Sequence, residues 1–301
     1  MPFEGMNNGP VVGLNTKRAA AIPITVRGAN CYSGISYDVD AYKYIRKLQD
    51  TPGVTLPEAW KRAINKFYVR LKQIGAYDQI DIMYLFIGGN AAAHKIEGKN
   101  PGGPYDITWN GAITHSVNGV AGGTFASGVI YGNTNFNLLS SSNKFTQTNG
   151  SLGAYVRTAL AGYNIGASDS ATNPLTSGSG AWCGSSNGSN LTGICNNTII
   201  NGSINVAVTS ARGMLVINRT GNTPGTFRGY RRGYSVSSPS VTSSARVNLN
   251  AFVAGINRNG TPYSSPNVIS FAYIGAGTIN PLEFAITVDN LQLALGRSIY
   301  T

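Results

Sequence analysis

The spacing of apolar residues changes from a strand-like to a helix-like pattern near the C-terminal end of the chain. Residues 268–274 are almost entirely apolar, which predicts a buried strand that ends at Gly275. A helix is expected over residues 281–295, because Asn280 suits the N-cap and Pro281 suits the first helical position. This strand and helix are apolar enough that they must cover another layer of the molecule.

The helix over 281–295 is expected to have one buried and one solvent-exposed face, and Gly296 is expected to end it. The buried face is predicted to hold Phe284, Val288, Leu291 and Leu295. The exposed face is predicted to hold Glu283, Thr287, Asn290 and Arg297.

Two more helices are expected in the first quarter of the chain. Asp40 is the predicted cap of a short helix that runs to Leu48. A longer helix is expected over 57–74, with Thr55 and Glu58 as its capping box. Its apolar residues repeat at three- and four-residue spacing and are expected to pack on the rest of the fold: Trp60, Ala63, Ile64, Phe67, Leu71 and Ile74.

Short apolar runs between Gly, Asn and Ser clusters predict strands in the remainder of the chain. The runs cover residues 80–87, 124–131, 152–157, 204–208, 214–218 and 251–256. Asn259-Gly260 predicts a hairpin turn, and the polar stretches 139–150 and 167–197 are expected to be loops. Many short strands at this spacing favour a mainly β fold, a two-sheet sandwich or jelly roll, over a parallel sheet.

The composition is unusually poor in charge and rich in glycine. The 301 residues include 38 Gly, and only 12% are charged, so Asn, Ser and Thr must supply much of the polar surface. The net charge is +11, but the basic residues are mostly scattered or lie on predicted helices, which argues against nucleic-acid binding. A fold of this composition suits a protein that works in an assembly or outside the cell.

One basic segment also contains aromatic residues. Arg228, Arg231 and Arg232 alternate with Tyr230 and Tyr234. We interpret the segment as an exposed strand, and leave open a negatively charged partner such as an acidic glycan or a neighbouring subunit.

The N-terminal residues 1–37 are expected to form an extended arm that attaches the chain to a neighbouring protein, ahead of a single sandwich domain over 38–301. They show no secretion signal, and the chain has no apolar run of the length that a membrane span requires. The chain is therefore expected to be made in the cytosol and to reach its site of action by another route, such as lysis.

Metal, cofactor and disulfide chemistry have little support in the sequence. The three cysteines give no disulfide framework, although Cys183 and Cys195 flank a polar loop and are candidates for one bridge in an oxidising medium. His94 and His115 are the only histidines and are expected to be hydrogen-bonded polar residues, not ligands. Asp169 is the one residue we single out as a candidate calcium ligand; no bound cofactor or metal is expected.

Several segments together resemble a recurrent module. They are FIGGNAAAHKI at 86–96, NGAITHS at 110–116, and the closing YIGAG at 273–277 and LGR at 295–297. The order of these segments over residues 56–297 is similar to concanavalin A-like, or laminin-G-like, jelly-roll domains in virion proteins of phages that infect Bacteroidetes, including crAss-like phages. This resemblance implies a two-sheet sandwich with a structural or receptor-binding role, and not a particular reaction.

Concanavalin A-like folds also include glycosidases and lyases, so an enzyme is the competing class. Retaining glycosidases need two carboxylates about 5 Å apart, and the chain has no Glu between Glu97 and Glu283. Only Asp106 and Asp169 lie in that span, and neither belongs to an alternating acidic strand. The sequence therefore predicts no catalytic residues, although an inverting pair assembled from distant residues stays open.

Glycan binding needs aromatic side chains beside hydrogen-bonding groups. Trp182, in a Gly/Ser-rich segment, is the best candidate for an exposed ring, ahead of Trp109. Tyr131, Tyr163 and Tyr263 adjoin glycine or proline turns. Each ring taken singly fits a structural role at the end of a sandwich, and together they favour a sugar-contacting surface.

These observations predict a non-enzymatic phage virion protein, as a fibre, spike or decoration of the capsid or tail, that binds host surface glycan. A homo-oligomer, with a trimer favoured by family analogy, is expected to contact other virion proteins through the arm. The alternatives are a purely architectural capsid or tail subunit and a polysaccharide-degrading glycosidase or lyase.

Overall fold

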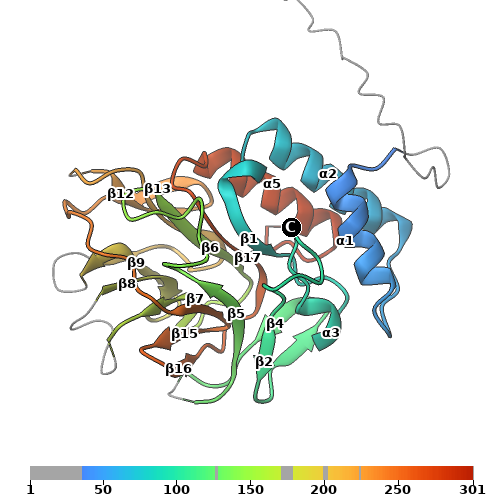
Figure 1. Ribbon diagram of the computed structural model, residues 1–301, viewed down its shortest axis with the longest axis horizontal. Helices are drawn as coiled ribbons and strands as arrows, with labels where there is room; N and C mark the ends of the chain where they lie inside the picture. The colour runs from blue at the N-terminus through green and yellow to red at the C-terminus, as the bar shows by residue number, and fades with distance from the viewer. Residues whose placement is uncertain (1–35, 126–127, 171–178, 199–202, 224, 301) are drawn as a thin grey trace, which may run out of the picture. The chain divides into compact units, whose positions relative to one another are not determined.

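The computed structural model describes residues 36–125, 128–170, 179–198, 203–223 and 225–300. From Tyr37 onward the chain forms one compact unit in which two β-sheets make a sandwich and helices pack on one of them (Figure 1). The predicted fold class, a mainly β two-sheet sandwich with two packed helices, is confirmed. The predicted arm, residues 1–37, lies outside the described residues except for its last two. Among the described helices, none has the length and apolarity needed to cross a membrane.

The first sheet is antiparallel and has β17 near its centre, because β6 pairs with one edge of β17 while β4 and β1 share the other. Its strands, in spatial order, are β13 (Tyr234–Ser237), β12 (Phe227–Arg231), β11 (Gly213–Arg219), β6 (Gly150–Val156), β17 (Ile269–Gly275), β4 (Gly119–Ala121) and β3 (Thr114–Ser116), with β1 (Ile80–Tyr84) beside β17.

The second sheet faces the first, and its pairs are antiparallel except for the short parallel contact between β15 and β7. Its strands, in spatial order, are β10 (Ile204–Ala207), β9 (Asn190–Thr198), β8 (Ser179–Ser185), β7 (Gly162–Ser168), β14 (Asn250–Val253), β5 (Tyr131–Asn137) and β2 (Thr108–Asn110). The hairpin of β15 (Gly255–Arg258) and β16 (Thr261–Ser264) extends it.

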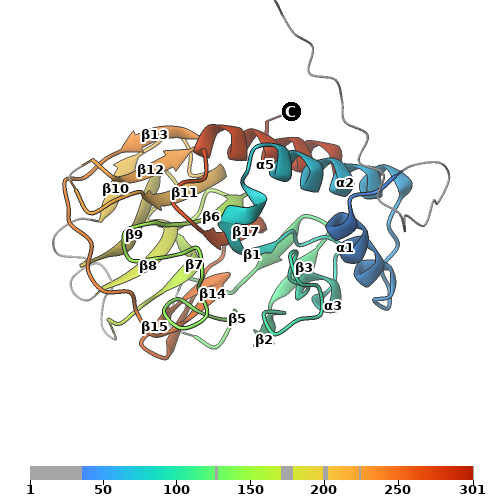
Figure 2. The same cartoon turned by 45° about the horizontal axis from the view of Figure 1, so that its top comes forward.

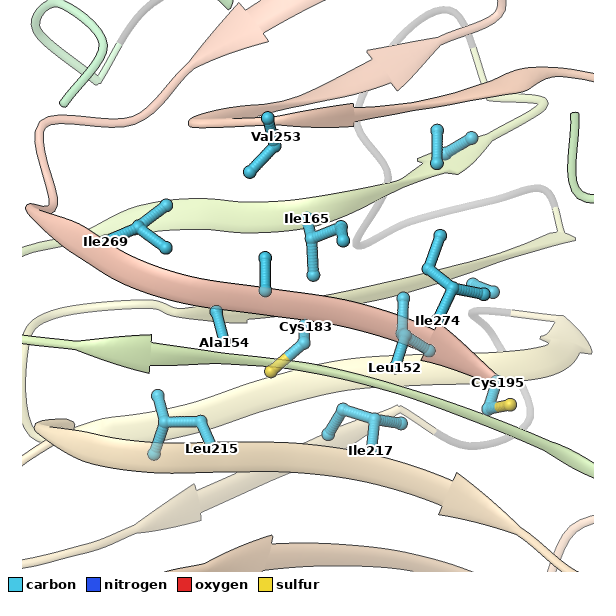
Figure 3. Close-up of a cluster of buried hydrophobic side chains, with 14 of the residues drawn as sticks. Leu152, Ala154, Ile165, Cys183, Cys195, Leu215, Ile217, Val253, Ile269 and Ile274 are labelled. Atoms are coloured by element: carbon cyan, nitrogen blue, oxygen red, sulfur yellow. The ribbon is translucent and has the colours of Figure 1, made fainter. Parts of the chain in front are cut away.

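The main core lies between the two sheets, where side chains from both inner faces interdigitate (Figure 3). Leu152 and Ile274 come from the first sheet, and Ile165 and Cys183 come from the second. Because side chains alternate between the two faces of each strand, these residues all point into the layer between the sheets, and their packing excludes water from it.

A second core lies on the outer face of the first sheet, beneath the helices. Helices α2 (Glu58–Gln73) and α5 (Pro281–Ala294) lie side by side across this face, and α1 (Val39–Gln49) packs against α2 (Figure 2). The rings of Phe67 and Phe284 contact Phe271 and Tyr273 of β17, with centroids 4.6–6.0 Å apart. The first sheet is therefore buried on both faces, as the apolar run at 268–274 predicts.

The helix ends agree with the sequence analysis at α5 and differ at the other two. Asn280 accepts hydrogen bonds from the N–H groups of Leu282 and Glu283, and Gly296 has a positive φ of 69° after the last turn, as predicted. The α1 helix is capped by Asp38 and not by Asp40. The α2 helix begins at Glu58 without a side-chain cap, so the predicted capping box at Thr55 is wrong. Pro57 explains this, because the residue before a proline is disfavoured in helical geometry.

The predicted solvent face of the last helix is also partly wrong. Thr287 is buried and donates its hydroxyl hydrogen bond to the carbonyl of Glu283, while Ile286 and Leu293 are exposed. Arg297 is buried because the chain turns back after Gly296 and inserts its guanidinium under the strands.

Three strand predictions and one loop prediction need correction. Phe86 has a positive φ, and β1 ends at Tyr84 instead of residue 87; the run over 251–256 is divided by Ala254, which also has a positive φ. The predicted strand at 124–131 is replaced by β5, which begins at Tyr131. The predicted loop at 167–197 contains β8 and β9, whose small residues are buried on both faces and gave no alternating pattern. The Asn259-Gly260 hairpin is confirmed between β15 and β16.

η1 (Tyr77–Gln79) and α3 (Ala91–His94) are short connecting helices.

Candidate functional site

Four aromatic side chains meet on the outer face of the second sheet, and we call Phe125, Tyr163, Trp182 and Tyr263 the aromatic face. They come from the segment after β4 and from β7, β8 and β16. Tyr163 lies at the centre, with its ring centroid 5.0 Å from Trp182, 5.5 Å from Phe125 and 5.9 Å from Tyr263. The sequence analysis named three of these rings, and the structure brings the three together.

A bulge in β7 places Tyr163 on this face. Tyr163 pairs with Gly184 and Ile165 pairs with Cys183, so the strand register shifts between Tyr163 and Ile165. In a regular strand these two side chains would point to the same face of the sheet, and the bulge puts them on opposite faces. Ile165 consequently points into the core, while Tyr163 points outward. The extra residue, Asn164, is held by a hydrogen bond from Nδ2 of Asn267 at 3.1 Å and by one from the N–H of Ala254 to its carbonyl.

Trp182 supports the aromatic face from below instead of presenting its own ring. Its side chain is 0% exposed, so the prediction of an exposed Trp182 is wrong. The residue lies in a central strand and not in a loop, and it packs against Tyr163, Ile194 and Ile256. Gly166, with φ of 138°, lets the backbones of β7 and β8 come close together at Trp182, because a Cβ on Gly166 would lie 2.5 Å from the Cα of Trp182.

Phe125 is the most accessible ring of the aromatic face, with 40% of its surface exposed. A small depression of about 60 Å³ beside it is lined by Tyr163, Ser185, Ser186 and Thr192, and of these Ser186 is exposed whereas the others are buried. That volume is below the ~300 Å³ typical of enclosed ligand sites, so this is an open surface with a small recess. Aromatic rings bordered by hydroxyl groups offer an apolar surface and hydrogen bonds to the same ligand.

Burial keeps Tyr163 of the aromatic face uncharged, and a neighbouring arginine adds one cation. Burial raises the pKa of Tyr163 to about 12, so its hydroxyl is neutral at physiological pH. The guanidinium of Arg258 lies 5.0 Å from the ring centroid of Tyr263, within the range of a cation–π interaction.

Tyr131, the remaining predicted tyrosine, belongs to a separate pair on the same sheet. Its ring stacks on Phe252 at 4.2 Å. Phe252 pairs with Gly166, and Gly166 pairs with Trp182, so Phe252 points to the outer side. Trp109 lies elsewhere, in β2, where its Nε1 donates to the carbonyl of Ala91 and its ring contacts His115.

The described acidic residues serve mainly as caps and loop anchors. Asp81 accepts hydrogen bonds from the N–H groups of residues 143–145, and Glu97 accepts them from Met83, Lys99 and Asn100. Asp38 and Asp40 both accept hydrogen bonds from Nζ of Lys72, at 2.7–2.9 Å. The prediction of no catalytic residues stays a prediction.

Potential metal and disulfide residues are also placed by the structure. Over the ranges that the structure covers, no group of three or more His, Cys, Asp and Glu is arranged to hold a metal. Asp169 accepts a hydrogen bond from the N–H of Ser179. Cys183 and Cys195 are free thiols on neighbouring strands, and burial raises the pKa of both.

Comparisons with known proteins give similarities of fold only. No family model matches the sequence, and no curated protein matches it. Domain 4 of AbnA, a GH43 extracellular arabinanase from Geobacillus stearothermophilus, has a TM-score of 0.41 and 13% identity over 70% of this chain and 98% of that domain. The CBM40 of the Ruminococcus gnavus IT-sialidase has a TM-score of 0.36 and 10% identity over 47% of this chain and 84% of that domain. A Trypanosoma rangeli sialidase has a TM-score of 0.45 and 8% identity, and only 39% of its length is matched, against 77% of this chain.

Sequence reasoning missed Phe125, the most exposed member of the aromatic face. It lies after β4, in the run 124–131 that was predicted as a strand, and nothing in that run marks its ring as part of a binding surface. Only the fold brings that segment beside β7 and β16, so no local signal distinguished it from other phenylalanines.

Proposed function

We propose that the chain is a non-enzymatic structural protein of a phage particle and that the aromatic face binds glycan on the host surface. The observation that carries the binding part is the meeting of Phe125, Tyr163 and Tyr263 beside the exposed hydroxyl side chain of Ser186. A sugar ring presents C–H groups on one side and hydroxyls at its edge, which this combination matches. The resemblance of the sequence to virion jelly-roll domains supports the particle part.

Glycan binding is tested with an array of bacterial surface polysaccharides, followed by calorimetry on the best ligand. Phe125→Ala and Tyr263→Ala are each expected to weaken binding about fivefold to tenfold, the loss that one stacking contact of about 1–1.5 kcal/mol produces. Leu293→Ala is the matched control, because it removes an exposed apolar side chain from α5, on the other sheet. Unchanged affinity in both aromatic variants contradicts the role of the aromatic face.

The particle role is tested separately. Mass spectrometry of purified particles is expected to find the chain, and a particle map is expected to show residues 1–37 in contact with another virion protein. Light scattering of the purified protein is expected to give a homo-oligomer, a trimer in our proposal. Absence from purified particles contradicts this role while leaving glycan binding intact.

Two alternative functions predict different results. A purely architectural subunit would be incorporated stably in the particle and would bind nothing on the array. A glycosidase or lyase would lower the viscosity of capsular polysaccharide or release new reducing ends. We disfavour the enzyme because Asp81 and Glu97 are committed to backbone N–H groups and Asp38 and Asp40 to Lys72.

A further inference from the structure

A second hollow opens at the side of the sandwich where the edge strands of the two sheets meet. It has a volume of about 300 Å³ and lies between the end of β10 and the β12–β13 hairpin. Residues 207–209 line one side, and Arg231, Arg232, Tyr234 and Val236 line the other. The volume reaches the lower limit of typical ligand sites, about 300 Å³.

Alternation along β12 directs Arg231 into this hollow. Phe227 and Gly229 face the second sheet, where Phe227 joins the main core and Gly229 approaches Ile204 of β10, and Arg231 continues the same side of the strand. Its Nη1 donates to the hydroxyl of Thr209 at 3.2 Å. Arg228 lies on the opposite side of the strand and is exposed.

The positive charge of this hollow has no direct counter-ion in the described part of the chain. No described carboxylate forms an ion pair with Arg228, Arg231 or Arg232. The Nε of Arg231 is buried and has no hydrogen-bond acceptor among the described residues, so no neighbouring group compensates this end of the guanidinium. Arg232 is held with its guanidinium 3.7 Å from the ring centroid of Tyr300. Burial raises the pKa of the carboxyl group of Asp289 to about 6, and the charge of Arg232 offsets part of this rise.

The rest of the lining is apolar or aromatic. Ala207, Val208 and Val236 form an apolar wall, and Tyr234 is 67% exposed at the rim. A planar guanidinium binds a carboxylate through two parallel hydrogen bonds, and an exposed tyrosine accepts the C–H side of a sugar ring. We propose that this hollow binds a carboxylate-bearing saccharide, with Arg231 on the carboxylate and Tyr234 against the ring.

An acidic saccharide fits better than a nucleic acid. Binding of a nucleic-acid strand relies on many phosphate contacts along a basic groove, with successive bases stacked on several aromatic rings. Here one tyrosine is exposed beside two arginines, in a hollow closed on one side by apolar residues. The inference is independent of the aromatic face, because no residue is shared between the two sites.

The test is calorimetric titration of the full chain with tetragalacturonate, with a neutral galactose oligomer of equal length and with single-stranded DNA as comparison ligands. Arg231→Gln is expected to weaken tetragalacturonate binding by about tenfold to a hundredfold, the range for loss of a hydrogen bond to a charged group. Arg231→Lys is expected to bind tetragalacturonate almost as weakly as Arg231→Gln, because lysine keeps the positive charge but lacks the planar guanidinium that forms two parallel hydrogen bonds. Arg228→Gln is the matched control and should stay within about twofold, since it removes the same charge from the other side of the same strand.

Three results would overturn the proposal. They are the absence of tetragalacturonate binding, equal losses in the Arg228 and Arg231 variants, and tighter binding of single-stranded DNA that also depends on Arg231. Phe125→Ala and Tyr263→Ala should leave this binding unchanged, which separates a failure here from a failure of the aromatic face. Thermal unfolding of each variant verifies that the fold is retained.

Discussion

The imidazoles of His94 and His115 face one another, with their Nδ1 atoms 3.2 Å apart. The N–H of Gly89 donates to Nε2 of His94 at 3.1 Å, so the neutral His94 carries its proton on Nδ1. His94 therefore donates to Nδ1 of His115, which carries its own proton on Nε2. The expectation that both histidines are hydrogen-bonded polar residues agrees with this pair.

This arrangement fixes the tautomer of each histidine, which nitrogen NMR can measure. We expect the spectrum at pH 7.5 to show His94 protonated at Nδ1 and His115 protonated at Nε2. His115→Ala removes the acceptor, and His94 should then lose its slow exchange with water while keeping its tautomer. Protonation of His94 at Nε2 in the wild type would contradict the hydrogen bond from Gly89.

Acid should destabilise the fold through His94. Burial, with His115 and Arg297 nearby, lowers the pKa of His94 to about 3, below its ordinary value of about 6.5. The stabilisation from the neutral side chain is therefore complete above pH 6.5 and is lost as the pH falls toward 3. The linkage relation gives a loss of about 3 kcal/mol between pH 7 and pH 4 from this group alone.

The measurement is urea unfolding at several pH values for the wild type and for His94→Gln. Other groups titrate in both proteins, so the difference between the two curves isolates His94. The difference in the free energy of unfolding between the wild type and His94→Gln should become smaller as the pH falls. Curves that stay parallel from pH 7 to pH 4 would contradict the prediction.

Arg297 should be more important for stability than a surface arginine. Its guanidinium is buried and donates to the carbonyls of Leu85, Phe86 and Ser270 at 2.6–3.0 Å, and burial lowers its pKa to about 9. Arg297→Met leaves these acceptors unpaired, and we expect a loss of about 3 kcal/mol or more in the free energy of unfolding. Arg228→Gln, at an exposed position, should change it by less than about 0.5 kcal/mol.

Gly166 should tolerate no side chain because β8 lies directly against it. A Cβ at Gly166 would be 2.2 Å from the carbonyl oxygen of Ala181, whereas a Cβ at Gly260 meets nothing within 4 Å. Both residues have positive φ, so Gly260→Ala reports the backbone strain alone, about 1–2 kcal/mol. Gly166→Ala is expected to lower the free energy of unfolding, measured with urea, clearly more than Gly260→Ala does. Equal losses in the two variants would show that strands β7 and β8 separate easily.

Cys183 and Cys195 should resist alkylation in the folded protein. Both thiols are buried, and burial raises the pKa of each, so the reactive thiolate is scarce. Mass spectrometry after iodoacetamide treatment should find both unmodified at pH 8 and both modified after unfolding in urea. Rapid native labelling of either residue would contradict the placement of these cysteines between the two sheets.

The sequence predicted the parts of the fold whose local chemistry and tertiary packing agree. The cap at Asn280, the turn at Gly296 and the hairpin at Asn259-Gly260 follow from local rules and are all present. Strands β8 and β9 were not predicted, because their Gly, Ala, Ser and Asn residues resemble a loop until both faces are covered.

The aromatic face was only partly predictable for a related reason. Tyr163 and Tyr263 were candidates from their neighbouring turns, but the bulge that turns Tyr163 outward depends on pairing with β8. The residues next to Trp182 in the sequence are typical of an exposed loop, and Trp182 is nevertheless fully buried. The orientations of Tyr163 and Trp182 both depend on pairing between strands that are separated in the sequence, so a short stretch of sequence does not predict them.

The position of β17 has a consequence for how the chain is made. Strands β1, β4 and β6 all pair with it, yet each is synthesised more than a hundred residues earlier. Until the ribosome has passed residue 275, these strands have unpaired edges of the kind that invite intermolecular association. Translation speed over residues 157–275 and the supply of chaperones should therefore govern the yield of folded protein.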